Sequence, residues 1–227
     1  MEEKKKKASR SERLSVGLLL AVTGGFLDAY TYGCRGGVFA NAQTGNLVLL
    51  GIHLAAGNIA RAVYYLFPIA AFLAGILLVE AIKHHCSTRR FLHWKQTVLL
   101  LEIALLFAAG FVPVSVPHLL VNVTVSFICS VQVHSFRSVE GLPYASTMCT
   151  GNMRSAMEQL YLALSKKDAG AARAVGVYSA VVGIFCLGAG VGALLTGLLG
   201  SRAVWLCCVP LLATCLLLQP GVLDSAT

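Results

Sequence analysis

Long apolar runs separated by short polar segments make up almost the whole chain. The runs are residues 14–34, 64–82, 96–111, 119–136, 174–200 and 203–219. Each is about long enough to cross the roughly 30 Å hydrocarbon core of a bilayer, which takes ~20 helical residues. The pattern predicts an all-α integral membrane protein with six transmembrane helices. These helices form a single transmembrane domain at 14–219, with no room for a soluble domain.

Two shorter segments, 44–57 and 150–164, are also expected to be helical. Each follows an irregular stretch of glycine, proline and polar residues, at 35–43 and 138–149. Helices of this length rise only about 21–23 Å, which is less than the thickness of the hydrocarbon core. We therefore expect two short re-entrant helices, each of which enters and leaves the membrane on one side.

An internal repeat relates the two halves of the chain. The tripeptide Thr44-Gly45-Asn46 recurs 106 residues later as Thr150-Gly151-Asn152. Both copies lie in the same order of elements: a long helix, an irregular stretch, a short helix and two more long helices. This order predicts a duplication, with repeat one at 14–112 and repeat two at 118–219. Three crossings in each unit would make the two repeats inverted relative to each other.

The positions of the basic residues predict the orientation. With a cytoplasmic N-terminus, only Arg35, Arg61 and Arg202 lie outside. The basic residues inside are then Lys4 to Lys7, Arg10, Arg13, Lys83, Arg89, Arg90, Lys95, Arg137, Arg154, Lys166, Lys167 and Arg173. Cytoplasmic loops carry an excess of Lys and Arg in membrane proteins. We therefore expect the basic tail 1–13, the loop 83–95, the region 138–173 and the short C-terminal tail 220–227 to be cytoplasmic.

Composition agrees with a membrane protein and argues against other classes. The apolar fraction is 57% and the charged fraction 12%, against about a quarter charged residues in soluble domains. The net charge of +8 comes from the tail and the short loops, as topology signals do, so we expect the lipid bilayer as partner and no nucleic acid. The eight cysteines lie mostly inside apolar runs without metal-ligand spacing, which indicates helix packing.

Two sequence motifs carry a family resemblance. GGFLDAYTYGCRGGVFANAQTGNLVLLG at 24–51 and GLPYASTMCTGNMR at 141–154 resemble the YoaK-like family of bacterial multi-pass membrane proteins, over about residues 12–220. The resemblance implies a location in the bacterial inner (cytoplasmic) membrane. That family is described as a membrane domain of unknown function, so the resemblance assigns no catalytic or binding residues.

The starts of the two short helices are the first candidate site. In an inverted repeat, the helix starts at Thr44 and Thr150 would meet near the middle of the membrane. Their free backbone N–H groups would favour an anion or a carboxylate there. The alternative is that both threonines are ordinary N-caps, with Gly45 and Gly151 allowing close packing.

Two ionisable residues at equivalent positions are the second candidate. Asp28 lies within the first long helix, where a carboxylate is costly to bury and is a functional hypothesis by default. A structural contact, for instance with Arg35, is the alternative. His134 lies at the equivalent place in repeat two, about 10 Å from Asp28 in depth by helical rise. We interpret the two as gates of one pathway, with a satisfied interior histidine as the alternative for His134.

These candidates point to transport. The expected function is a small secondary transporter or permease for a small anionic or polar metabolite, with a passive channel or a non-transporting scaffold as alternatives. No motif of an enzyme, a cofactor or a metal site is apparent, and a homo-oligomer is left open. The cluster His84, His85 and Cys86 lacks a second ligand pair at suitable spacing. The substrate-binding candidates are Asp28, Asn41, Thr44, Gly45, Asn46, His134, Thr150, Gly151 and Asn152.

Other features receive structural interpretations. Arg154 and Glu158, four residues apart on a helix, are expected to form a local salt bridge. Gly188 and Gly192 form a GxxxG pattern, in a helix that also holds Gly183 and Gly197, which predicts close helix packing.

Overall fold

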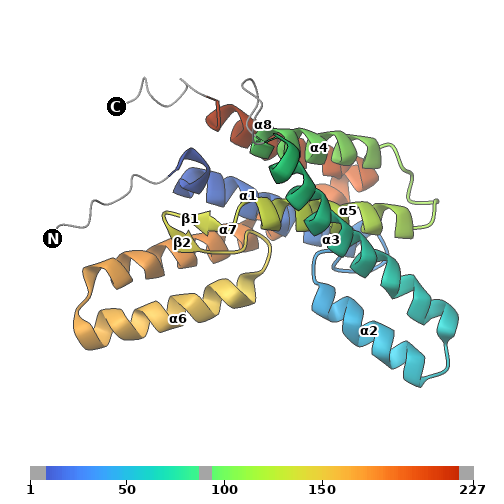
Figure 1. Cartoon of the computed structure of the whole chain (residues 1–227). Coiled ribbons are helices and arrows are strands. Elements are labelled where there is room, and N and C mark those ends of the chain that lie inside the picture. The colour runs from blue at the N-terminus through green and yellow to red at the C-terminus, as the bar shows by residue number, and fades with distance from the viewer. Residues whose placement is uncertain (1–8, 87–93, 220–227) are drawn as a thin grey trace.

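The computed structural model describes residues 9–86 and 94–219, and these are almost entirely helical (Figure 1). The first half of the chain contains a short 3-10 helix (Arg10–Glu12), α1 (Leu14–Cys34), α2 (Gln43–Ala55), α3 (Ile59–Cys86) and α4 (Trp94–Ala109). The second half contains α5 (Leu119–Ser135), β1 (Ser138–Val139), β2 (Leu142–Pro143), α6 (Cys149–Lys166), α7 (Ala169–Leu199), the 3-10 helix η2 (Gly200–Cys207) and α8 (Cys208–Leu217).

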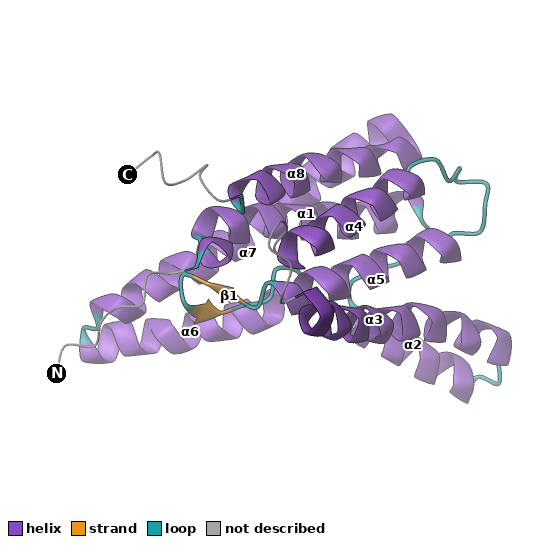
Figure 2. Ribbon diagram, turned by 45° about the horizontal axis from the view of Figure 1, so that its top comes forward, coloured by secondary structure: helices purple, strands orange, loops and turns teal. Residues whose placement is uncertain are grey.

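Helix pairs that are distant in sequence form the body of the molecule. Helix α1 packs along α7, and α3 packs along α5. The short helices form hairpins with the long helices that follow them, α2 with α3 and α6 with α7, and these hairpins diverge from the body (Figures 1 and 2). Helix α4 packs on α5 and α8, and α8 packs on α1.

Glycines allow the closest helix contacts, as the GxxxG pattern predicted. A Cβ atom at Gly188 would overlap the carbonyl oxygen of Val22, and one at Gly192 would lie 2.8 Å from the Cα of Phe26. The backbone of α7 therefore lies directly against α1 at these two positions, which confirms that Gly188 and Gly192 are packing residues. Gly183 and Gly197 differ, because a Cβ at either would meet nothing within 4 Å.

Three segments of the described chain are long and apolar enough to cross a membrane by length and composition. They are Leu14–Cys34, Ile59–His84 and Ala169–Leu217, and Leu119–Ser135 is a shorter apolar helix. The last long segment is 49 residues and contains a reversal at Gly200, whose φ of +57° is readily adopted only by glycine. After this reversal α8 returns against α1 and α4. The fold is therefore all-helical, and its long apolar helices are consistent with a membrane protein.

Two local elements were not expected. The irregular stretch 138–149 contains a two-stranded antiparallel hairpin, with Ser138 opposite Pro143 and Val139 opposite Leu142. Its turn residues Glu140 and Gly141 both have positive φ, +50° and +78°, as tight hairpin turns require. The run 203–219 also differs from the single helix that was predicted, because its first residues belong to the 3-10 helix η2.

Candidate functional site

A cavity of about 810 Å³ lies where the two short helices begin. Its walls come from α1, from the first residues of α2 and α6, from the loop between β2 and α6, and from Phe185 of α7. Six of the nine predicted substrate-binding residues line it: Asp28, Asn41, Thr44, Thr150, Gly151 and Asn152. The structure therefore brings together residues from both sequence motifs.

One hydrogen bond joins the loops that lead into the two short helices. The Nδ2 of Asn41 donates to the carbonyl oxygen of Thr147, at 3.0 Å. These two residues are 106 positions apart, which is also the spacing of the repeated tripeptide. The bond holds the start of α2 beside the start of α6.

The asparagines of the two tripeptides form hydrogen bonds within their own segments of the chain. The Nδ2 of Asn152 donates to the carbonyl oxygen of Ala145 at 2.7 Å, and its Oδ1 accepts from the backbone N–H of Ala145 at 3.2 Å. The Nδ2 of Asn46 donates to the Oε1 of Gln43 at 2.9 Å. Both asparagines are 2% exposed, and Asn46 does not line the cavity. The side chain of Asn152 therefore holds the backbone of the loop before α6, whereas that of Asn46 holds the side chain of Gln43.

The alternative interpretation made the two threonines N-caps and the two glycines packing residues, and the structure does not agree with it. The N-caps are Ala42 and Met148, and neither helix has a side-chain cap. Thr44 and Thr150 are exposed, one residue beyond the first residue of each helix. A Cβ at Gly45 or Gly151 would meet nothing within 4 Å, so neither glycine is needed for close packing. Gly151 lines the cavity, whereas Gly45 does not.

Asp28 reaches the cavity from α1 and lies beside Asn41. Its Oδ1 is buried and has no hydrogen-bond partner among the described residues. A second cavity, of about 460 Å³, lies between α1 and α7. The two cavities share two lining residues, Asp28 and Phe185. Asp28 therefore lies where the two cavities meet.

Arg35 is not the partner of Asp28, so the structural alternative for the carboxylate is wrong in this detail. The guanidinium is fully buried and donates to the hydroxyl of Tyr30, from Nε at 3.0 Å and from Nη2 at 2.8 Å. It also donates to the carbonyl oxygens of Val112 at 2.7 Å and Pro113 at 3.2 Å. Arg35 thus connects the end of α1 to the loop after α4.

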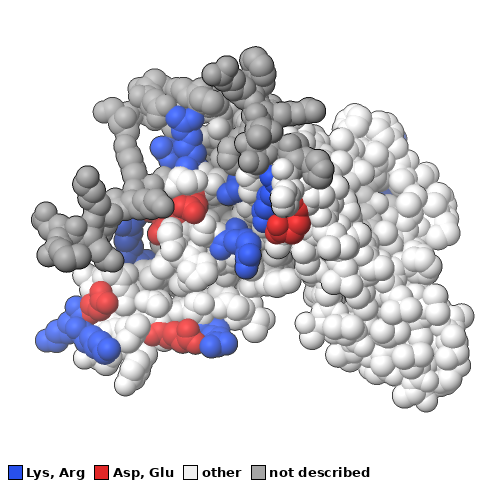
Figure 3. All heavy atoms as spheres, viewed as in Figure 1, with Lys and Arg blue, Asp and Glu red and all other residues white. Residues whose placement is uncertain are grey.

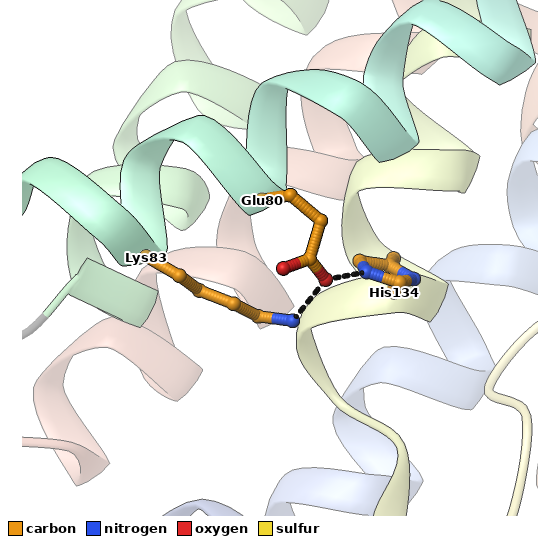
Figure 4. Close-up of polar contacts among 3 residues, drawn as sticks. All are labelled: Glu80, Lys83 and His134. Carbon is orange, nitrogen blue, oxygen red and sulfur yellow. Dashed lines mark hydrogen bonds and ion pairs between the residues drawn. The ribbon is translucent and has the colours of Figure 1, made fainter.

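His134 lies apart from this cavity, on α5. Its Nε2 lies 2.5 Å from the Oε1 of Glu80 on α3, which also pairs with Lys83 at 2.8 Å (Figure 4). The neighbouring Val133 lines the cavity, whereas His134 does not. The partner Glu80 was missed because it stands at the polar end of a long helix, where a carboxylate draws no attention in the sequence.

Several further residues bear on the site. The sequence did not single out Thr147, Gln43 or Tyr144, which line the cavity from loops or helix ends. Arg137, expected only as a cytoplasmic charge, also lines the cavity and is exposed. Glu102 of α4 is fully buried, and neither of its carboxylate oxygens has a hydrogen-bond partner in the described part of the chain, but it does not line the cavity.

The local salt bridge expected on α6 is confirmed, because the Nε of Arg154 lies 2.8 Å from the Oε1 of Glu158. In residues 9–86 and 94–219, no three His, Cys, Asp or Glu side chains are grouped to hold a metal ion. The side chains of His85 and Cys86 lie outside the described residues.

Comparison with known proteins identifies the family. No curated protein and no solved structure matches the chain. The model of the DUF1275 family, described as a protein of unknown function, matches residues 16–217. This family contains the YoaK-like proteins, so the resemblance of the two sequence motifs is confirmed. The chain belongs to the DUF1275 family.

Proposed function

We propose that this protein is a small secondary transporter or permease of the bacterial inner membrane, and that it carries a small anionic or polar metabolite. The observation that carries the proposal is the cavity at which both short helices begin. The first residues of a helix have backbone N–H groups without intrahelical partners and a positive dipole end, and both favour a negative charge. Because Thr44, Thr150 and Gly151 line the cavity, the N–H groups at the starts of both α2 and α6 lie at one site.

The size of the cavity suits a metabolite. Binding sites for small molecules have volumes of ~300–1,000 Å³. The cavity of about 810 Å³ falls in this range, and it contains few charges, namely Asp28 and Arg137. It would therefore hold a molecule larger than a simple ion.

The packing of the helices supports the inverted repeat of six spans and two re-entrant helices. Exchanging α1 with α5, α2 with α6, α3 with α7 and α4 with α8 converts the pair α1 and α7 into α5 and α3. The same exchange converts the α2 and α3 hairpin into the α6 and α7 hairpin, and the pair α4 and α5 into α8 and α1. Each converted pair is itself a packed pair. Many secondary transporters have inverted repeats with a site at the repeat interface.

The proposal predicts that Gly151→Leu abolishes transport without unfolding the protein. A leucine there would occupy the cavity beside the helix start, and its Cβ would meet no neighbouring atom within 4 Å. The matched control is Gly183→Leu on α7, where a Cβ also meets nothing within 4 Å and which lines neither cavity. Uptake of radiolabelled carboxylates, amino acids and phosphate is measured in proteoliposomes, and the unfolding temperature in detergent.

We expect at least one probe to be accumulated by the wild type and by Gly183→Leu, with uptake reduced more than tenfold in Gly151→Leu. The unfolding temperatures of all three proteins should agree closely. Accumulation against a gradient separates a transporter from a passive channel, which would only equilibrate the probe. Equal uptake by Gly151→Leu and the wild type would refute the assignment of this cavity.

A further inference from the structure

Three buried oxygen atoms of residues that line the cavity lack partners within the described chain. They are the Oδ1 of Asp28, the Oδ1 of Asn41 and the Oγ1 of Thr147, and none forms a hydrogen bond within the described chain. Asn41 is 2% exposed and Thr147 is 6% exposed, so neither residue is open to bulk solvent. Buried polar atoms are nearly always paired, and leaving one unpaired costs free energy. Three such atoms at one cavity point to a ligand that would pair with them.

These residues form one contiguous group. Asn41 lies beside Asp28, within reach of the carboxylate through both its side chain and its backbone. The amide nitrogen of Asn41 is already committed to the carbonyl oxygen of Thr147 at 3.0 Å. This bond leaves the amide oxygen of Asn41 as the free atom of that side chain. All three residues line the same cavity.

The chemistry of the group is that of a cation site. A carboxylate oxygen, an amide oxygen and a hydroxyl oxygen are hard ligands of the kind that hard cations prefer. Among the described residues, the only carboxylate lining the cavity is that of Asp28, which balances a single positive charge. The buried guanidinium of Arg35 does not provide that charge, because it is bonded to Tyr30 and to the loop after α4.

We propose that Asp28, Asn41 and Thr147 bind a monovalent alkali cation of the size of sodium, which couples to substrate binding in the same cavity. The proposal rests on the proposed transport function. An anion at the starts of α2 and α6 would be repelled by an unbalanced Asp28 carboxylate. A cation at this carboxylate removes the repulsion, so each ligand raises the affinity for the other. Arg137 lines the same cavity but is exposed, so solvent screens its charge.

Cation binding is tested on the purified full chain in lipid nanodiscs, without any substrate. The unfolding temperature is measured in chloride salts of sodium, potassium, ammonium and choline at one pH and one ionic strength, and ²²Na⁺ binding is measured by equilibrium dialysis. A ligand that binds only the folded state raises its stability in proportion to the logarithm of its concentration above Kd. We expect saturable binding of ²²Na⁺ and an unfolding temperature several degrees higher in sodium than in choline.

Two variants and one control locate the site. Asp28→Asn should abolish ²²Na⁺ binding, because it removes the balancing charge. Thr147→Val keeps the shape of the side chain and removes a hydroxyl that bonds to no described residue, so it should fold normally and weaken binding about tenfold. The control Glu158→Gln removes an exposed carboxylate on α6 and should bind as the wild type does.

The outcomes separate this inference from the proposed function. Equal unfolding temperatures in sodium, potassium and choline, or wild-type ²²Na⁺ binding by both variants, would overturn the cation site. Stabilisation by ammonium but not by sodium would overturn it too, and would assign the three oxygens to an amino group of the substrate. Substrate uptake that persists without sodium refutes only the cation site, whereas ²²Na⁺ binding without uptake of any probe refutes only transport.

Discussion

The hairpin of α2 and α3 and the hairpin of α6 and α7 differ in the charge of their surfaces. Leu47, Val48 and Ile52 of α2 are each 55% exposed. Helix α6 also exposes apolar side chains, with Leu164 at 74%, but it exposes the charged Arg154 and Glu158 beside them, at 80% and 57%. On the face shown in Figure 3, the charged side chains lie on the half that contains α6, and the half that contains α2 is almost free of them.

This difference indicates which hairpin meets lipid. An apolar exposed surface is favourable in hydrocarbon, whereas exposed charges there are expensive. We infer that α2 contacts the acyl chains and that the charged face of α6 contacts water and lipid headgroups. The two short helices thus begin at one cavity, while the surfaces of their hairpins differ in charge.

The strongest test of this comparison places a charge on each hairpin. Ile52 of α2 and Met157 of α6 are 55% and 58% exposed, so they form a matched pair. An arginine near the centre of a membrane helix costs ~2.5–3.5 kcal/mol on insertion scales. Ile52→Arg should therefore reduce the amount of protein inserted by tenfold or more, and Met157→Arg should leave it near the wild-type amount. The measurement is the yield of carbonate-resistant membrane protein.

The same two arginine variants can also contradict the inference that α2 contacts lipid. If both arginine variants are inserted equally well, α2 does not contact hydrocarbon and the two surfaces have the same environment. Ile52→Leu serves as the control for size and should be inserted as the wild type is.

A smaller effect, on the free energy of unfolding, is expected for glycine substitutions in the long helices of the two hairpins, α3 and α7. A Cβ at Gly75 of α3 would overlap the Oγ of Ser130 and lie 2.8 Å from the carbonyl oxygen of Phe127, both on α5. Overpacking of this kind costs ~1–3 kcal/mol. Gly75→Leu should therefore lower the free energy of unfolding, measured by denaturant titration in detergent, by about that amount. Gly183→Leu of α7 should have almost no effect, and equal destabilisation would show that α7 is covered at Gly183 by another chain.

The smallest effect concerns the ion pair on α6. Removing an exposed pair at this spacing on a helix costs only ~0.2–0.5 kcal/mol. Arg154→Ala should change the free energy of unfolding by no more than this, and less in high salt. A loss several times larger would mean that Arg154 is buried against another molecule and that α6 does not face water.

The helices were largely predictable from the sequence, because apolar runs record burial or contact with lipid directly. Helix α1 has the predicted bounds of 14–34, and the short helices begin within a residue of the expected 44 and 150. The tripeptide repeat also predicted that their starts would share a site. The partners of polar side chains were less predictable. Whether Arg35 bonds to Asp28 or to a distant loop depends on how helices pack, and no local pattern records that.

The buried guanidinium of Arg35 has a consequence for how the protein is made. Its acceptors in the chain beyond α1 are the carbonyl oxygens of Val112 and Pro113, which follow it by 77 and 78 residues. A ribosome that adds about 5–20 residues per second needs roughly 4–15 seconds to reach them. During that time the end of α1 keeps a charged group whose final bonds do not yet exist. The first helix therefore cannot settle into its final depth until α4 has been synthesised, and early truncations should leave Arg35 in the headgroup region.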